Sequence, residues 1–388
     1  MIAYIWVFLA CAGTTFVVTP IVRRLALRFG AIDQPSDRKV HPKATPTMGG
    51  IAMYLGFLVG LGASRVLPFF SDMNHGSAEP LAALVTCTAI VGLGVIDDKR
   101  GVSALGKLTA QVLIGGVLVL LGVQVLYFWF GFGPVSVGSD LAVPLTILWL
   151  ALVVNAVNLV DGLDGLAAGM VAIAAGAFFI YMVRTESLFG DASSAALLSA
   201  ITVGICVGFL PWNFYPARIF MGDSGAMLLG MLLTIATISG VARNPFPPSG
   251  GDLAAVVGTV MVPLLVLAIP FLDVMLAIIR RTWRGRGIGQ ADKEHIHHRL
   301  LDIGHSHRSA VLLMYLWSAL ISASALAIGL IDGRLVVGAI ILSLMVLFAV
   351  TALPRLDRWR GRAELVPGSV AGQAPEPPAE ESATNLSG

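Results

Sequence analysis

Eleven long apolar stretches divide this sequence, and they constrain its fold more than any other feature. They cover residues 2–22, 48–67, 81–96, 108–128, 141–157, 165–183, 194–212, 224–241, 253–280, 310–331 and 334–353. A helix needs about 20 predominantly apolar residues to cross the hydrocarbon core of a bilayer. Hydrophobic residues make up 56% of the chain and charged residues only 12%, which argues against a water-soluble globular protein. The sequence therefore predicts an all-α, polytopic membrane protein with about 11 transmembrane helices.

The connections between these stretches are too short to form a separate soluble domain. We therefore expect one membrane-embedded domain, residues 1–362, followed by a tail, residues 363–388. The tail is rich in Pro, Glu and Ser and has little to bury, so we expect it to be disordered. Cys11, Cys87 and Cys206 lie within apolar stretches, and we interpret them as buried core residues and not as a disulfide framework.

Lysine and arginine are distributed unevenly among the connections. Numbered from the N-terminus, the odd connections and the C-terminal segment hold 21 of the 25 Lys and Arg residues, and the even connections hold 4. Cytoplasmic loops of membrane proteins carry the excess of positive charge. We predict that the odd connections and the C-terminus are cytoplasmic, that the N-terminus faces outward, and that the protein resides in the plasma (inner) membrane.

The conspicuous polar motifs all fall on the predicted cytoplasmic side. They are PTMGG at 46–50, DD at 97–98, NLVDGLDG at 158–165, Asn213 with FMGDSG at 220–225, and HIHHR at 295–299. Unpaired carboxylates, amides and imidazoles are costly at the edge of the hydrocarbon unless they bind something. Five loops that offer such groups at one membrane face predict a single ligand-binding site there.

The residue types in these loops indicate a divalent cation and a phosphorylated ligand. Aspartate oxygens suit Mg²⁺, which usually takes one or two carboxylates together with substrate phosphates. The adjacent Asp97 and Asp98 repel each other unless a cation or a proton intervenes; alternatively, they cap helix N-termini. The histidine cluster in its arginine-rich loop favours phosphate binding over a zinc site or a solvated loop. Gly49 and Gly50 either start a helix or bring the backbone close to a ligand.

These motifs, in this order and spacing, resemble those of the polyprenyl-phosphate N-acetylhexosamine-1-phosphate transferase family. The resemblance extends over nearly the whole membrane portion. It implies transfer of a phosphosugar from a UDP-sugar to a lipid phosphate, with release of UMP. HIHHR with arginines upstream is similar to the WecA-like branch, which uses UDP-GlcNAc and undecaprenyl or decaprenyl phosphate. The alternative is the phospho-MurNAc-pentapeptide transferase branch. A secondary transporter is a more remote alternative, disfavoured because the acids lie at span ends on one side and not near the midplane.

The resemblance also implies roles for individual residues. It implies catalytic roles for Asp97, Asp98, Asp161, Asp164, His297 and His298; substrate binding by Lys43, Thr47, Asn158, Asn213, Phe220, His295 and Arg299; and a metal site at Asp223 shared with Asp98. The expected cofactor is Mg²⁺, with Mn²⁺ as a substitute, and the expected partners are UDP-GlcNAc, the polyprenyl phosphate and the bilayer, with no nucleic acid. A homodimer is left open. For the chemistry we favour direct attack by the lipid phosphate, with a covalent aspartyl intermediate as the alternative.

Overall fold

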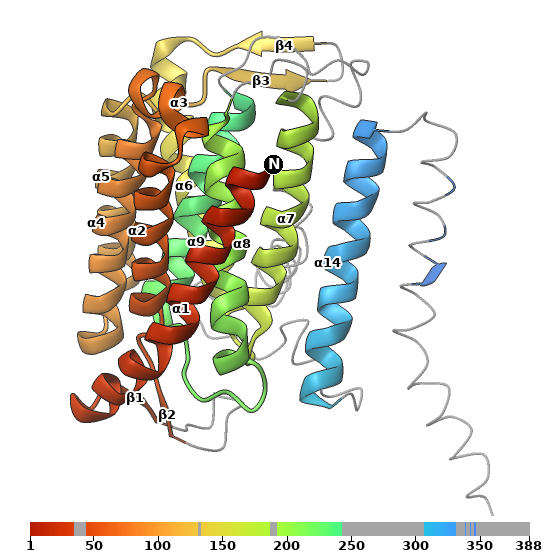
Figure 1. The fold of residues 1–388 in the computed structure, drawn as a ribbon. Helices are drawn as coiled ribbons and strands as arrows, with labels where there is room; N and C mark the ends of the chain where they lie inside the picture. The colour runs from red at the N-terminus through yellow and green to blue at the C-terminus, as the bar shows by residue number, and fades with distance from the viewer. Residues whose placement is uncertain are drawn as a thin grey trace, which may run out of the picture.

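The computed structural model of the chain describes residues 1–34, 44–130, 133–186, 192–242 and 306–330, with 338, 342, 345 and 346 as isolated positions. Its helices are α1 (Ile2–Arg28), α2 (Gly50–Val66), α3 (Ser71–Gly76), α4 (Glu79–Arg100), α5 (Ala104–Leu120), α6 (Ser139–Val160), α7 (Leu166–Glu186), α8 (Ser194–Asn213), α9 (Gly222–Thr237) and α14 (His307–Leu330). A 3₁₀ turn, η1 (Pro68–Phe70), precedes α3, and a π turn, η2 (Ile238–Ala242), extends α9. The long helices run side by side as a bundle (Figure 1).

The prediction of several membrane-spanning helices is confirmed for the part of the chain that the structure describes. A helix covers each of the first eight predicted stretches and the tenth. Among the described residues, six helices are long and apolar enough to cross a bilayer. Helix α2 with the segment Pro68–Gly76 would make a seventh span, bent by 89° at the break. The ninth stretch, the C-terminal tail and all but four residues of the eleventh stretch lie outside the described residues, so the total of eleven stays a prediction.

The fourth predicted stretch, 108–128, is shorter than a span in the structure. Helix α5 ends at Leu120, and Gly122 follows with a φ of 84°, a conformation that glycine adopts without strain. Strand β3 (Tyr127–Phe130) then pairs antiparallel with β4 (Gly133–Ser136), because an aromatic and β-branched run favours a strand. A second hairpin, β1 (Ile32–Asp33) with β2 (Thr45–Pro46), lies at the opposite end of the bundle (Figure 1). The all-α prediction therefore holds apart from two short hairpins.

Helices α8 and α9 form the centre of the bundle. In α9, 83% of the apolar window is buried inside the protein, against 28% for α1 at the periphery. Small residues let neighbouring helices approach α9 closely. A Cβ atom on Gly230 would lie 2.6 Å from the Cα atom of Val154 in α6. The central helix therefore depends on its glycines to reach its neighbours.

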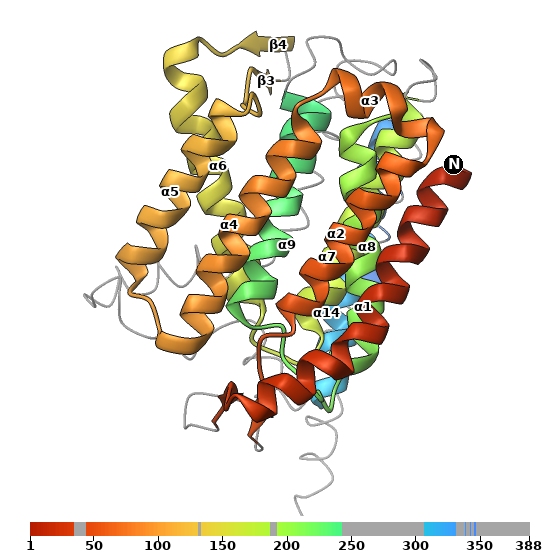
Figure 2. The same ribbon diagram turned by 60° about the vertical axis from the view of Figure 1, so that its left-hand side comes forward.

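Consecutive long helices run in opposite directions, so every second connection falls at the same end of the bundle (Figures 1 and 2). The connections α1–α2, α4–α5, α6–α7 and α8–α9 share one end. These are the connections that carry the PTMGG, DD, NLVDGLDG and FMGDSG motifs. The predicted convergence of the polar motifs is confirmed for these four, whereas HIHHR lies outside the described residues.

Candidate active site

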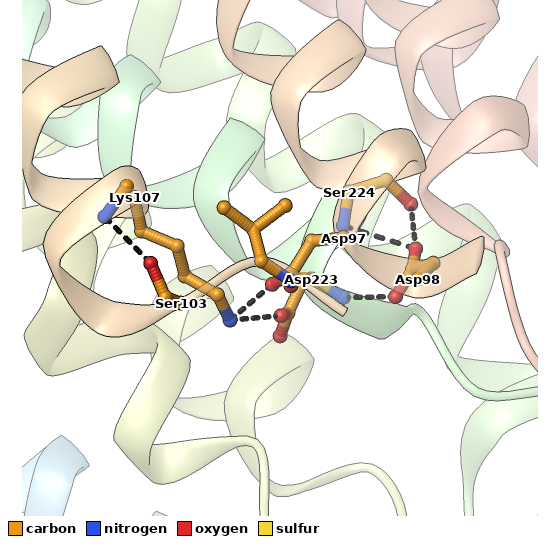
Figure 3. A network of polar contacts seen from close by, with 8 residues as sticks. Asp97, Asp98, Ser103, Lys107, Asp223 and Ser224 are labelled. Carbon is orange, nitrogen blue, oxygen red and sulfur yellow. Dashed lines mark hydrogen bonds and ion pairs between the residues drawn. The ribbon is translucent and has the colours of Figure 1, made fainter. Parts of the chain in front are cut away.

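The Asp97–Asp98 pair occupies the last turn of α4 and begins no helix of its own. Asp98 instead caps the N-terminus of a different helix, α9. Its Oδ1 accepts a hydrogen bond from the backbone N–H of Asp223 at 2.8 Å, and its Oδ2 accepts bonds from the N–H and Oγ of Ser224 at 3.3 and 2.8 Å. A carboxylate is favoured at the positive end of a helix. Asp98 thereby fixes the position of Asp223 (Figure 3).

A lysine bridges the two remaining carboxylates of this junction. Lys107, in the first turn of α5, forms an ion pair with Asp97 and donates to Oδ2 of Asp223 at 2.7 Å (Figure 3). The Asp97 side chain is buried and also accepts a hydrogen bond from the N–H of Val102 at 2.6 Å. Lys107 and Asp223 are partly exposed, with 22% and 28% of their side chains accessible. A ligand can therefore reach the cation and the second carboxylate.

Lys107 was not among the site residues predicted from the sequence, where it contributed only to the count of positive charges. Its signal was present: a lysine lies ten positions after Asp97, just inside an apolar helix that otherwise carries no charge. A charged side chain in such a position needs a partner. Ser103 caps α5 by accepting from the N–H of Gly106 at 3.1 Å, and this sets where the helix begins and where Lys107 points.

The PTMGG motif joins the start of α2 to the start of α9. The N–H of Gly49 donates to the carbonyl of Phe220, and the N–H of Gly50 donates to that of Met221, both at 2.9 Å. A Cβ atom on Gly50 would lie 2.1 Å from the backbone N of Gly225. Of the two roles considered for these glycines, the structure supports the first: they start a helix and permit close backbone contact, here with another helix.

Thr47 lies beside the same turn. Gly222 has a φ of 68°, and a Cβ atom there would lie 2.6 Å from both Oγ1 of Thr47 and the carboxylate oxygens of Asp98. Thr47 is thus brought next to Asp98, and its role in substrate binding stays a prediction. Lys43, the other residue expected beside the nucleotide, lies outside the described residues.

Asn213 and Asp164 hold two loops of the site together. The Oδ1 of Asn213 accepts from the N–H of Gly165 at 3.1 Å, and its Nδ2 donates to the carbonyl of Ile219 at 3.0 Å. Asn213 is 2% exposed, so both amide groups serve the backbone of neighbouring loops. Asp164 is half-buried, and its Oδ2 accepts from the N–H of Ala217 at 2.9 Å. The structure therefore gives Asn213 a connecting role at the position predicted for substrate binding.

Asp161 shows how much negative charge this end of the bundle carries. Burial, and to a smaller extent the charges of three neighbouring aspartates, raise the pKa of Asp161 to about 8. Those neighbours are Asp223, Asp98 and Asp164. Asn158, in the last turn of α6, and Phe220 are both half-buried near the same loops. Four carboxylates that interact at the edge of an apolar bundle favour a bound cation.

The residues of this site fit a hard divalent cation that shares its coordination with a ligand. Lys107 already places one positive charge between Asp97 and Asp223, so these two carboxylates favour a cation beside them. Within the described ranges, no three acidic, histidine or cysteine side chains converge into a complete metal cage. Mg²⁺ often keeps only one or two carboxylate ligands and takes the rest from phosphate and water.

Helix α14 closes the site beside the α6–α7 loop. The hydroxyl of Tyr315 donates a hydrogen bond to the carbonyl of Gly165. At the start of α14, the ring of His307 stacks on Tyr215 with a centroid distance of 4.4 Å. This helix follows the HIHHR segment in the chain. His295, His297, His298 and Arg299 themselves lie outside the described residues.

Known proteins resemble this chain over most of its length. Residues 80–241 match the family described as glycosyl transferase family 4. The chain is 38% identical to decaprenyl-phosphate N-acetylglucosaminephosphotransferase of Mycolicibacterium smegmatis, over 90% of this chain and 88% of that protein. It is 35% identical to a probable undecaprenyl-phosphate N-acetylglucosaminyl 1-phosphate transferase of Bacillus subtilis, over 84% and 86%. A phospho-N-acetylmuramoyl-pentapeptide-transferase of Desulforudis audaxviator is 33% identical, over 82% and 97%.

The first two relatives are named for N-acetylglucosamine phosphate transfer, and the same two match with higher identity than the third. The family match spans the α4–α9 region that builds the junction of Asp97, Lys107 and Asp223. The chain therefore belongs to the polyprenyl-phosphate N-acetylhexosamine-1-phosphate transferases of glycosyl transferase family 4, as its motifs predicted.

Proposed function

We propose that this protein transfers GlcNAc-1-phosphate from UDP-GlcNAc to a polyprenyl phosphate, yielding GlcNAc-pyrophosphoryl-polyprenol and UMP. The product is the first lipid-linked intermediate of a surface or cell-wall polysaccharide. The observation that carries the proposal is the junction in which Lys107 bridges Asp97 and Asp223 at the end of an apolar bundle. Such a junction can neutralise phosphates within reach of a substrate that is dissolved in the bilayer. The names of the most similar relatives supply the donor and the acceptor.

The reaction joins two anions, so the protein must position them and offset their repulsion. An oxygen of the lipid phosphate attacks the sugar-bearing phosphorus of UDP-GlcNAc, and the bond from that phosphorus to the bridging oxygen breaks to release UMP. Lys107 offsets negative charge on the pyrophosphate. A phosphate monoester has a second pKa near ~6, so most of the acceptor is already deprotonated at neutral pH. Asp97 takes up the proton from the remainder.

Asp223 would hold Mg²⁺, and the ion would neutralise charge on the pyrophosphate and on the departing UMP. The resemblance implies that Asp98 shares the metal site. Because both of its oxygens already accept hydrogen bonds from the start of α9, we assign it the orienting role. Mn²⁺ has the same preference for oxygen ligands, and we expect it to substitute.

The site faces the cytoplasm in this proposal, because UDP-sugars are cytoplasmic and the positively charged connections lie at the same end. The chain then crosses the plasma membrane about eleven times, with its N-terminus outside. The segment HIHHR would select the donor, and what supports this role is that α14, the next described helix in the chain, contacts the α6–α7 loop of the site through Tyr315 and Gly165. A GlcNAc residue presents hydroxyls and an acetamide, whereas a MurNAc-pentapeptide adds an arm that needs open space. Selection would therefore rest on occlusion as much as on attraction.

The test is radiolabelled transfer by one purified preparation from UDP-GlcNAc and from UDP-MurNAc-pentapeptide, with decaprenyl and undecaprenyl phosphate as acceptors. We expect labelled lipid only from UDP-GlcNAc, and only with a divalent cation present. Faster transfer from the MurNAc donor would place the protein in the other branch. Release of UMP in the absence of any lipid acceptor would favour the covalent aspartyl intermediate over direct attack.

A further inference from the structure

Lys107, which contacts Asp97 and Asp223, lies on a helix at the periphery of the bundle. Helix α5 is 17 residues long, packs chiefly against α4 and α6, and lies at the edge of the bundle (Figure 2). Its outer face is apolar and open to lipid, with Leu113 67% and Leu120 87% exposed. Because lipid tails are as apolar as leucine, burial of leucine does little to fix such a helix in place. Another interaction must therefore fix the position of α5 along its axis, and with it the position of Lys107 relative to Asp223.

A polar pair lies one helical turn from Lys107, on the face of α5 that meets α6. Gln111 is fully buried, and its Oε1 accepts a hydrogen bond from Nδ2 of Asn155 at 2.7 Å. Residues four apart share one face of a helix, so Gln111 lies on the same face of α5 as Lys107, one turn further along. Asn155 is itself fixed, because the same Nδ2 donates to the carbonyl of Ala151 in its own helix at 2.7 Å.

If its only role were to pack α5 against α6, this polar pair would destabilise the fold. The Nε2 of Gln111 has no hydrogen-bond partner among the described residues, and an unpaired buried amide group opposes folding. Two aliphatic side chains could fill the same space without that cost. The benefit of the pair is directional, because a hydrogen bond fixes the register of two helices and an apolar contact does not. Asn155 also lies on the helix that leads to Asp161, so the bond connects both sides of the site.

We propose that Gln111 and Asn155 form a register lock that positions Lys107 against Asp97 and Asp223 during phosphosugar transfer. Neither residue touches the substrate; both are positioning residues that act through Lys107. This inference rests on the proposed function. A shift of α5 by about 1 Å would break the geometry at the lysine, and a displacement of that size is enough to slow a reaction by as much as ~10²-fold.

The experiment measures UDP-GlcNAc turnover by purified Gln111→Leu and Asn155→Leu variants, together with their thermal stability. We expect kcat to fall roughly tenfold, with the KM for the lipid acceptor nearly unchanged and the protein folded. Thr237→Val is the matched control, because it removes another hydrogen bond of α6, from Trp149 to Thr237 at 3.0 Å, toward the far end of the bundle. That variant should keep its kcat within about twofold.

Two further variants separate positioning from general destabilisation. In a Lys107→Met background, Gln111→Leu should cause no additional loss of the residual activity. The exchanged pair Gln111→Asn with Asn155→Gln should recover most of the activity, because it restores one amide hydrogen bond. An equal loss from Thr237→Val, or an undiminished effect of Gln111→Leu without Lys107, would overturn the lock. Absence of transfer by the wild-type protein would instead overturn the proposed function.

Discussion

The aspartates of this site differ in what else they contact, and this decides what each can do. Asp98 accepts hydrogen bonds from the start of α9, and Asp97 accepts a hydrogen bond from Val102 and forms an ion pair with Lys107. Asp223 contacts Lys107 and remains partly open. Its carboxylate is therefore the one most able to take a metal ion and a phosphate together.

Changing Asp223 to Asn keeps its shape but removes the charge that attracts the cation. We expect turnover of UDP-GlcNAc to fall by at least ~10²-fold, in line with losses of electrostatic stabilisation elsewhere. Excess Mg²⁺ should recover part of the activity. Asp72→Asn, at an exposed position in α3 at the opposite end of the bundle, is the control. Near-normal turnover by Asp223→Asn at ordinary Mg²⁺ would remove Asp223 from the metal site.

The raised pKa of Asp161 predicts a dependence of stability on pH. The folded protein keeps this carboxyl protonated up to a pKa of about 8, whereas the unfolded chain releases the proton near the ordinary aspartate pKa of 3.8. Between these values the unfolded state binds fewer protons, so the free energy of unfolding decreases as pH rises. In metal-free buffer the melting temperature should fall by roughly 2 °C per unit from pH 5.5 to 8. Asp161→Asn should flatten this slope, and an unchanged slope would contradict the assignment.

At the scale of the elements, helices could be predicted from apolar runs, and their ends could not. The long runs located nine helices because membrane helices need continuous apolar sequence. The fourth stretch was overextended because the residues after Leu120 are as apolar as a helix, although they form a loop and then strand β3 of a hairpin. The residues that Gly50 and Asp98 contact could not be predicted either, because these contact residues lie in α9, more than a hundred positions later in the sequence. A single sequence shows which residues are polar, but not which helix they will meet.

The close approach of α2 and α9 gives a prediction with a control in the same helix. Gly50→Ala places a Cβ atom 2.1 Å from the backbone N of Gly225, whereas Gly62 has nothing within 4 Å. Backbone cannot yield as a side chain can, so Gly50→Ala should separate the starts of α2 and α9. We expect loss of most transferase activity and a lower melting temperature. Gly62→Ala should be neutral, since alanine is the better helix former. Equal melting temperatures for the two variants would contradict the packing.

At the scale of the whole molecule, the site lies at one end of the bundle because the connections that carry its motifs all lie at that end. Lys99 and Arg100 lie at the site end, and η1 and α3 lie at the other. Single cysteines at Arg100 and Asp72, both exposed positions, on a background without native cysteines should therefore react from opposite sides of the membrane. We expect an impermeant thiol reagent to label Asp72→Cys in intact cells and Arg100→Cys only after permeabilisation. Labelling of both in intact cells would contradict the topology.

The order of the helices along the chain also bears on how the enzyme is made. Helix α9 lies at the centre of the bundle, yet it follows α2, α4, α6 and α8 in the sequence. During synthesis, Asp97 and Lys107 enter the membrane region well before Asp223, and Asp98 has no helix to cap until residue 222 emerges. The catalytic junction can therefore form only after that helix has inserted. Activity is thus a late event of biogenesis, coupled to completion of the bundle.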